Sequence, residues 1–462
     1  MMKNSIKRIY LLKRSLLLIL GLNTFILTAL PIHPVRGETL TPSMMIPNLN
    51  ALDEKQANEA MMRFEVQALL QSMPLNTERL KQAANHFKSK EDEKARAALD
   101  INAITQEQNN LLEQLAKKPE VQAQLDDLAV ELVLLARLTE INYALGDERI
   151  SKAGSYFEQA LKSGRNSEVL YQYAQFAQHN KQNKLAENLL SELVAEARKQ
   201  AATKPESLGY LTMLLSELGS MKQANDPQSE EGYQLQVEAL TNTRQVLAST
   251  PEALEQLALS LSNLWMAFDS TTTHRDDIIK HYAETIETLR PLAANQAIYA
   301  PAFANTLNIQ AIMLQQSDNA STQQETIEKL YTEAIALNRK LASAKPNEHL
   351  PNVAMTLAGL GSFLSKKDTR HGEAEKLMNE ALSINRQLAA THPDPYLRDL
   401  YQGQVIRTLE GLADAYIDWK QADKARSALE EALTVAQTLA KAKPDQYGMQ
   451  VTSIQEALKK LN

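Results

Sequence analysis

Cysteine is absent from this chain of 462 residues, and glycine and aromatic residues are scarce. The lack of cysteine excludes disulfide bonds, thiolate metal sites and cysteine nucleophiles. Only 14 glycines are present, and none of them forms a Gly-rich phosphate-binding loop. The residues that dominate instead are Ala, Leu, Gln, Glu and Lys, all of which favour helix. The composition therefore predicts an all-α protein.

Motifs of catalysis and metal binding are also missing from the sequence. No G-x-S-x-G, H-E-x-x-H or paired-carboxylate motif occurs. The tightest polar cluster is HRDDIIKHY at 274–282, where His274, Asp277 and His281 share one helical face. The two histidines lie too far apart to ligate one ion without distortion, so we expect a helix start capped by Thr272 or Thr273. We therefore expect no enzyme activity, no metal and no cofactor.

The N-terminus carries basic residues and then the apolar run SLLLILGLNTFILTAL at 15–30. This run is shorter than the roughly 20 apolar residues that a membrane-spanning helix needs. Val35 and Gly37 place compact residues at the −3 and −1 positions of a cut before Glu38. We predict a signal peptide at 1–37 and export to the periplasm or the exterior. An uncleaved membrane anchor is the alternative, and it leads to the same compartment.

The remaining chain is acidic. Without residues 1–37 it carries 43 basic against 56 acidic residues, a net charge of −13. Such a surface repels phosphate backbones and anionic membranes. We expect a protein or peptide partner of basic character and no nucleic acid. Contact with a membrane is expected only if the N-terminal segment is kept.

One segment of thirteen residues recurs along the chain. It reads AIALNRKLASAKP at 334–346, ALSINRQLAATHP at 381–393 and ALTVAQTLAKAKP at 432–444. Earlier, more divergent copies give a repeat with a spacing of 46 to 51 residues. Its last positions are Pro205, Pro251, Ala297, Pro346, Pro393 and Pro444, and seven residues before them stand Arg198, Arg244, Arg290, Arg339, Arg386 and Gln437.

Each repeat has room for two helices. Ala374, Met378 and Ala381 are spaced i, i+4, i+7, which places them on one helical face where the small residues allow another helix to approach closely. The proline disfavours helix in the residue before it and suits the first position of the next helix. We therefore predict that each proline ends one helix and begins another. Arg339 and Arg386 are expected to make contacts between repeats rather than to bind ligand.

The best copy matches the pattern L-x-x-L-A-x-x-Y, eight residues, then A-x-x-x-L-x-x-A. Its residues are Leu409, Leu412, Ala413, Tyr416, Ala425, Leu429 and Ala432. This pattern resembles the tetratricopeptide repeat family, and the long period is similar to that of kinesin light chain repeats. The resemblance implies a right-handed superhelical solenoid of antiparallel helix pairs over 131–462. Residues 38–130 are expected to form a helical N-terminal module.

The resemblance also implies a scaffold that binds proteins through its concave surface, which the first helix of each pair lines. On the best-matched first helix, Glu410, Asp414 and Asp418 are spaced i, i+4, i+8. They are the candidate partner-binding residues, and a merely solvated helix face is the alternative. Chaperone-binding members of the family carry basic and amide residues here, so their activity is not transferred. Trp265 and Trp419 are expected to be packing residues.

Two other functions fit parts of the sequence. The protein is alternatively an accessory subunit of a cell-envelope assembly, which a broad exposed apolar patch, especially on residues 38–130, would favour. The second alternative is a hydrolase with its site in 254–320, where the repeat pattern is weakest. A deep pocket with convergent His, Asp or Ser would support the hydrolase, and a filled helical core would argue against it.

Overall fold

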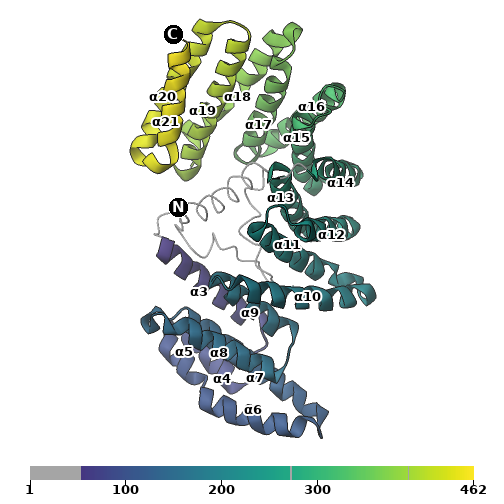
Figure 1. The fold of residues 1–462 in the computed structure, drawn as a ribbon, viewed down its shortest axis with the longest axis vertical. Coiled ribbons are helices and arrows are strands. Elements are labelled where there is room, and N and C mark those ends of the chain that lie inside the picture. The colour runs from purple at the N-terminus through teal and green to yellow at the C-terminus, as the bar shows by residue number, and fades with distance from the viewer. Residues whose placement is uncertain (1–53, 271–272, 394, 462) are drawn as a thin grey trace. The chain divides into compact units, whose positions relative to one another are not determined.

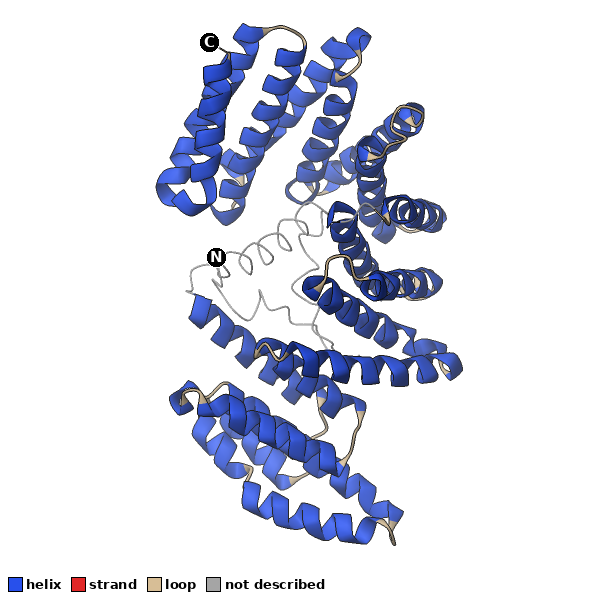
Figure 2. Cartoon of the chain, in the orientation of Figure 1, coloured by secondary structure: helices blue, strands red, loops and turns tan. Residues whose placement is uncertain are grey.

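The computed structural model describes residues 54–270, 273–393 and 395–461. Within these ranges every regular element is a helix (Figure 2). The predicted all-α solenoid of antiparallel helix pairs is confirmed. The predicted signal peptide at 1–37 lies outside the described residues. In the described part of the chain, no helix is both long and apolar enough to cross a bilayer.

The chain divides into two compact units between residues 246 and 247. We call the described residues 54–246 the N-terminal unit and the described residues from 247 onward the C-terminal unit. The expected boundary between a helical module and the array, at 130/131, falls inside one continuous helix of the N-terminal unit. The helices of that unit are α3 (Glu54–Ser72), α4 (Glu78–Lys88), α5 (Asp92–Ala98), α6 (Ile101–Leu115), α7 (Gln122–Glu140), α8 (Glu148–Ser163), α9 (Ser167–His179), α10 (Asn183–Thr203), α11 (Leu208–Asn225) and α12 (Glu230–Val246), with short 3-10 helices at Pro119–Val121, Tyr143–Leu145 and Pro205–Ser207.

The C-terminal unit continues the alternation of helices (Figure 1). In both units consecutive helices pack as pairs: α7 with α8, α9 with α10, and so on to α19 with α20. We call the earlier member of each pair its first helix and the later member its second helix. The elements of this unit are α13 (Leu254–Ser270), α14 (Arg275–Asn295), α15 (Ala300–Gln316), α16 (Gln324–Ala344), α17 (Pro346–Ser365), α18 (His371–Thr391), α19 (Pro395–Asp418), α20 (Ala422–Ala442) and α21 (Pro444–Lys460), with 3-10 helices at Pro251–Ala253, Ala297–Tyr299 and Asp368–Arg370.

The repeated proline acts as predicted at two of its positions. Lys345 and Lys443 have φ of −138° and −137°, and α17 and α21 begin at the prolines that follow. At Pro205 and Pro251 a 3-10 turn comes first. The segment after Pro393 differs too, because α19 begins only at Pro395.

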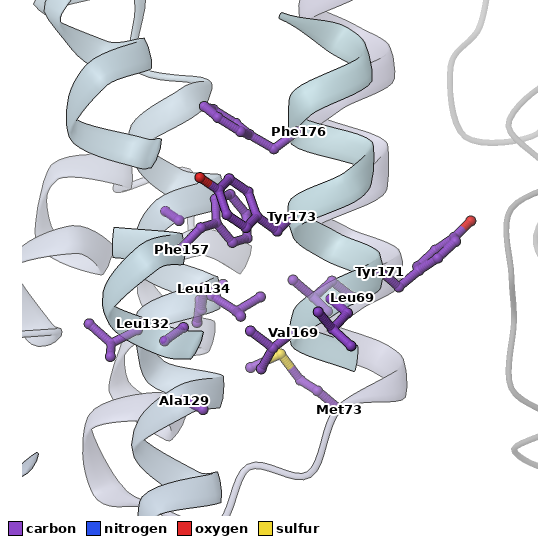
Figure 3. Packing of buried hydrophobic residues seen from close by; sticks show 14 of the residues in the cluster. Leu69, Met73, Ala129, Leu132, Leu134, Phe157, Val169, Tyr171, Tyr173 and Phe176 are labelled. Atoms are coloured by element: carbon purple, nitrogen blue, oxygen red, sulfur yellow. The ribbon is translucent and has the colours of Figure 1, made fainter. Parts of the chain in front are cut away.

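Aromatic residues of successive helices form the core of the N-terminal unit (Figure 3). The rings of Phe157 and Tyr173 stack with centroids 5.0 Å apart and planes 6° apart. Phe176 lies against both of them. In Figure 3, Tyr171 points away from this cluster, from the other side of α9. Since the apolar cluster also includes residues of α3, α4, α6 and α7, the expected N-terminal helices share one core with the first repeats.

Small residues let the two helices of a pair approach closely, as the spacing predicts. Ala374 and Ala381 are fully buried and Met378 is 3% exposed. A Cβ atom at Gly361 of α17 would overlap the Met378 side chain of α18. Gly361 therefore occupies the small-residue position of the repeat because no side chain fits there.

Four of the repeated arginines link one second helix to the next. Arg339 Nη2 of α16 lies 2.5 Å from Glu380 Oε1 of α18, and Arg386 pairs with Glu431 of α20. The prediction that Arg339 and Arg386 make contacts between repeats is confirmed. We call this series of ion pairs the ladder. Its described pairs are Arg198–Glu238, Arg290–Glu333, Arg339–Glu380 and Arg386–Glu431. Arg165, in the loop after α8, makes a similar pair with Glu192 of α10.

A buried amide accompanies the ladder in the later repeats. Asn338 directly precedes Arg339, and its Nδ2 donates to Thr356 Oγ1 of α17 at 3.3 Å. Asn385 makes the same bond to Thr408 of α19 at 3.2 Å. Adjacent residues of one second helix thus bind the first and second helices of the following repeat. A buried amide whose donor is satisfied also fixes the register between the helices.

Candidate partner-binding surface

The three predicted acids lie on one face of α19. Lys366, at the end of α17, places its Nζ 2.8 Å from Asp418 Oδ2. Gln450 of α21 donates to Glu410 at 3.0 Å. The face is thus contacted by α17, the preceding first helix, and by α21. We call Glu410, Asp414 and Asp418 the acidic face.

The surroundings of the acidic face oppose its negative charge. Burial raises the pKa of Glu410, and the charge of Asp414 adds to the effect, against the hydrogen bond from Gln450. Partial burial also raises the pKa of Asp414, and Asp418 adds to it while Lys366 opposes it. The carboxylates of Glu410 and Asp414 are therefore less stable as anions than they would be in water.

Asp414 differs in its contacts from the acids of the ladder. Among the described residues no hydrogen bond or ion pair engages its carboxylate, which is exposed. The acids of the ladder, such as Glu333 and Glu380, each pair with an arginine. The charges on the second helices are thus partly used in holding the array together, whereas Asp414 is free to contact another molecule.

Ile417 adds an apolar contact beside the acids. It lies three residues after Asp414, and 42% of its surface is exposed, which is unusual for a large hydrophobic residue of this chain. Tyr416, in contrast, is buried and donates its hydroxyl to Glu375 of α18 at 2.8 Å. Among the described side chains of α19, the exposed ones are therefore Arg407, Asp414, Ile417 and Asp418, so acids and one apolar residue are exposed over its last two turns and one cation lies before them.

Both tryptophans pack inside the array, as predicted. Trp419 stacks on His371 with centroids 4.5 Å apart, and its Nε1 donates to the Ser365 carbonyl at 3.0 Å. Trp265 stacks on Phe268 with centroids 5.8 Å apart. Trp419 thus contacts α17 and α18 while Trp265 stacks within its own helix, α13, so neither indole forms a free binding platform.

The histidine cluster at 274–282 is the start of α14. His274 itself occupies the N-cap position and forms no capping hydrogen bond through its side chain, so the predicted threonine cap is wrong. His281 Nδ1 lies 3.4 Å from Glu284. No group of three or more His, Asp or Glu residues is arranged to hold a metal ion in the described ranges.

The divergent region 254–320 contains the pair of α13 and α14 and the first helix α15, and its interior is packed. Leu257, Leu264 and Phe268 of α13 are buried, as are Ile278 and Tyr282 of α14. The Tyr282 hydroxyl donates to the Leu261 carbonyl at 2.7 Å. Apolar side chains and a satisfied tyrosine fill this region, which is the arrangement that argues against the hydrolase alternative.

A shallow hollow of about 240 Å³ lies between α10, α11 and α12. Leu218 and Leu235 line it together with the ladder pair Arg198 and Glu238. Its lining holds one serine and no histidine, so it provides no nucleophile with an adjacent base. The hollow is a gap between second helices that a ladder pair bridges.

The sequence analysis found the arginines of the ladder but not the glutamates that accept from them. Glu333, Glu380 and Glu431 each stand six residues before the repeat's Arg or Gln position. A search for charges of opposite sign at fixed offsets from the arginine would have identified them. In the later copies, Glu and Ala stand side by side, four residues follow, and the arginine comes next. The arginine of one copy then pairs with the glutamate of the following copy.

Comparison with known proteins gives no family for this chain. No family model matches the chain, and no curated protein matches it. Among solved structures, BtubC (BKLC) from P. vanneervenii is similar with a TM-score of 0.41 and 20% identity, over 56% of this chain and 92% of that one. A circular tandem repeat protein with a novel repeat topology is similar with a TM-score of 0.20 and 13% identity, over 87% of this chain and 96% of that one. The chain is a helical repeat protein by its own helix pairs.

Proposed function

We propose that this protein is an exported, tetratricopeptide-like scaffold without catalysis of its own, and that it binds a basic protein or peptide at the acidic face of α19. The cationic groups of the partner would contact Glu410, Asp414 and Asp418, and an apolar side chain would pack on Ile417. This mode corresponds to recognition of a peptide or partner helix on a helical surface.

The observation that carries the proposal is the raised pKa of both Glu410 and Asp414. Charges that a fold destabilises are common at functional sites, where they are kept at a cost in stability. A cation from a partner would reduce this cost by adding positive charge beside Asp414, where the charge of Lys366 does not outweigh burial and the charge of Asp418. Binding energy and electrostatic steering then come from the same carboxylates.

The alternative of an envelope subunit has less support in the described residues. Large exposed hydrophobic residues there are isolated: Ile298, Ile417 and Met449. A broad apolar docking patch would gather such residues in one place. Isolated apolar residues next to charge fit a partner that is bound mainly through polar contacts.

Site-specific photocrosslinking in the producing cells tests the proposal. A photoreactive residue at position 417 is expected to capture a basic protein, whereas one at Lys340, an exposed position of α16, is expected to capture none. The capture at 417 must disappear when Asp414→Asn and Asp418→Asn are combined. Capture that persists in that variant, or no capture at 417, would contradict the proposal.

A further inference from the structure

A buried cluster of charged groups joins α3, α7 and α9 within the N-terminal unit. Arg137 of α7 is 1% exposed and pairs with Glu65 of α3 and, at 2.5 Å, with Glu140 of α7. His179, the last residue of α9, lies 3.5 Å from Glu65 through Nε2 and 3.6 Å from Glu140 through Nδ1. The imidazole thus lies between two carboxylates that come from different helices.

The remaining contacts of the cluster involve Glu140. Asn180 donates its side-chain amide to the Glu140 carboxylate at 3.0 Å, and Arg149 of α8 donates to the Glu140 backbone carbonyl at 2.7 Å. Glu140 is the last residue of α7. Arg137 bonds it within that helix, Arg149 bonds it from α8, and Asn180 bonds it from the end of α9. Among the described residues, Glu65 is bonded by Arg137 and faced by His179. The attachment of α3 at this point therefore depends on those two cationic groups.

The protonation state of His179 decides whether both carboxylates have a donor. The imidazolium carries a proton on each nitrogen and can donate to Glu65 and to Glu140 at once. The neutral ring has one N–H, so its other nitrogen presents a lone pair to a carboxylate. The charges agree with this geometry, because Arg137 alone leaves a buried net charge of −1 that the imidazolium cancels.

We infer that protonation of His179 holds α3 on the repeat array, and that loss of this proton loosens α3 as the pH rises. About 32% of the His179 side chain is exposed, so protons from solvent reach it. The inference is independent of the acidic face and of the partner proposed for it.

The direction of the pH effect follows from the contacts. Burial disfavours the charged ring, but the hydrogen bond to Glu140 and the charge of Glu65 outweigh it and raise the pKa of His179. A group with a raised pKa in the folded state stabilises fully below its unfolded value, and the stability is lost as the pH rises through the folded value. The loss therefore falls above the ordinary titration range of histidine, near and above neutral pH.

Hydrogen exchange of the full chain between pH 5.5 and 8.5 tests this inference. Protection factors of amides in residues 59–72 should fall as the pH rises, by about tenfold for each unit that separates the folded and unfolded pKa of His179. His179→Gln should make α3 protection low and independent of pH, whereas His179→Lys should keep it high and independent of pH.

His86→Gln is the control, because His86 is in the same unit and bonds Glu91 rather than this cluster. This variant should keep the wild-type pH response. A merely structural histidine would lose protection equally at every pH and would not be rescued by lysine. The inference is overturned if His179→Gln retains the pH dependence of α3, or if wild-type α3 shows none.

Discussion

At the scale of single residues, the positions that match between repeats are those where side chains touch within a pair. Gly361 and Met378 illustrate this, because the pattern predicts a small residue facing a large one and the structure places them in contact. The pattern also predicts the burial of Leu409 and Tyr416. It cannot predict which charges are paired, since that depends on how far one helix lies from the next.

Gly361→Ala is expected to destabilise the protein by about 1–3 kcal/mol, because the added methyl overlaps Met378 and the packed pair must move apart. Gly448→Ala in α21 is the matched control. Nothing lies near a Cβ at that position, so the better helix propensity of alanine should stabilise by about 0.5–1 kcal/mol. Urea unfolding of both variants measures these effects, and equal effects would refute the packing argument.

Asp414→Asn should stabilise the protein slightly at pH 7, by no more than about 0.5 kcal/mol, which is the range of surface substitutions. The raised pKa of Asp414 means that its charge opposes folding above the folded pKa, and this effect is absent below the ordinary value, where the acid is protonated. The gain should thus vanish near pH 3 in thermal unfolding.

Glu430→Gln on the exposed side of α20 is the comparison for Asp414→Asn, and it should leave stability nearly unchanged at both pH values. A loss of stability in Asp414→Asn at pH 7 would show that its carboxylate is a structural group.

At the scale of elements, the repeat sets the helix pairs, and the proline sets most of their ends. The exception is Pro393, because the next helix, α19, begins at a second proline, Pro395. The ladder was only half predicted, because its glutamates lie in the next copy, more than forty residues away in most pairs. Sequence spacing reveals such a partner only when the same offset recurs in several copies.

The ladder pairs are expected to contribute little individually. In a double-mutant cycle, Arg339→Ala and Glu380→Ala should show a coupling of about 0.2–1 kcal/mol, because both side chains are partly exposed. The coupling should decrease at high salt. The control cycle combines Lys340→Ala with Glu380→Ala and should show no coupling in the same urea measurement. Coupling of similar size in the control would contradict a specific Arg339–Glu380 interaction.

At the scale of the whole molecule, our proposal places partner binding on the first helix α19, whereas the ladder lies on second helices. Second helices carry the ladder and bind one repeat to the next, as expected for a solenoid whose repeats contact their neighbours. The first helix α19 carries acids that its own fold disfavours. The sequence predicted the solenoid and the common face of these acids, but the division between residues 246 and 247 has no counterpart in the regular repeat spacing.

The most direct test compares two double neutralisations for partner capture at position 417 and for thermal unfolding. Asp414→Asn with Asp418→Asn changes the first helix α19, and Glu380→Gln with Glu431→Gln changes the ladder. Our account predicts that the first variant loses capture while its unfolding temperature is nearly unchanged, and that the second keeps capture while its unfolding temperature falls. Loss of capture in the ladder variant alone would contradict the account.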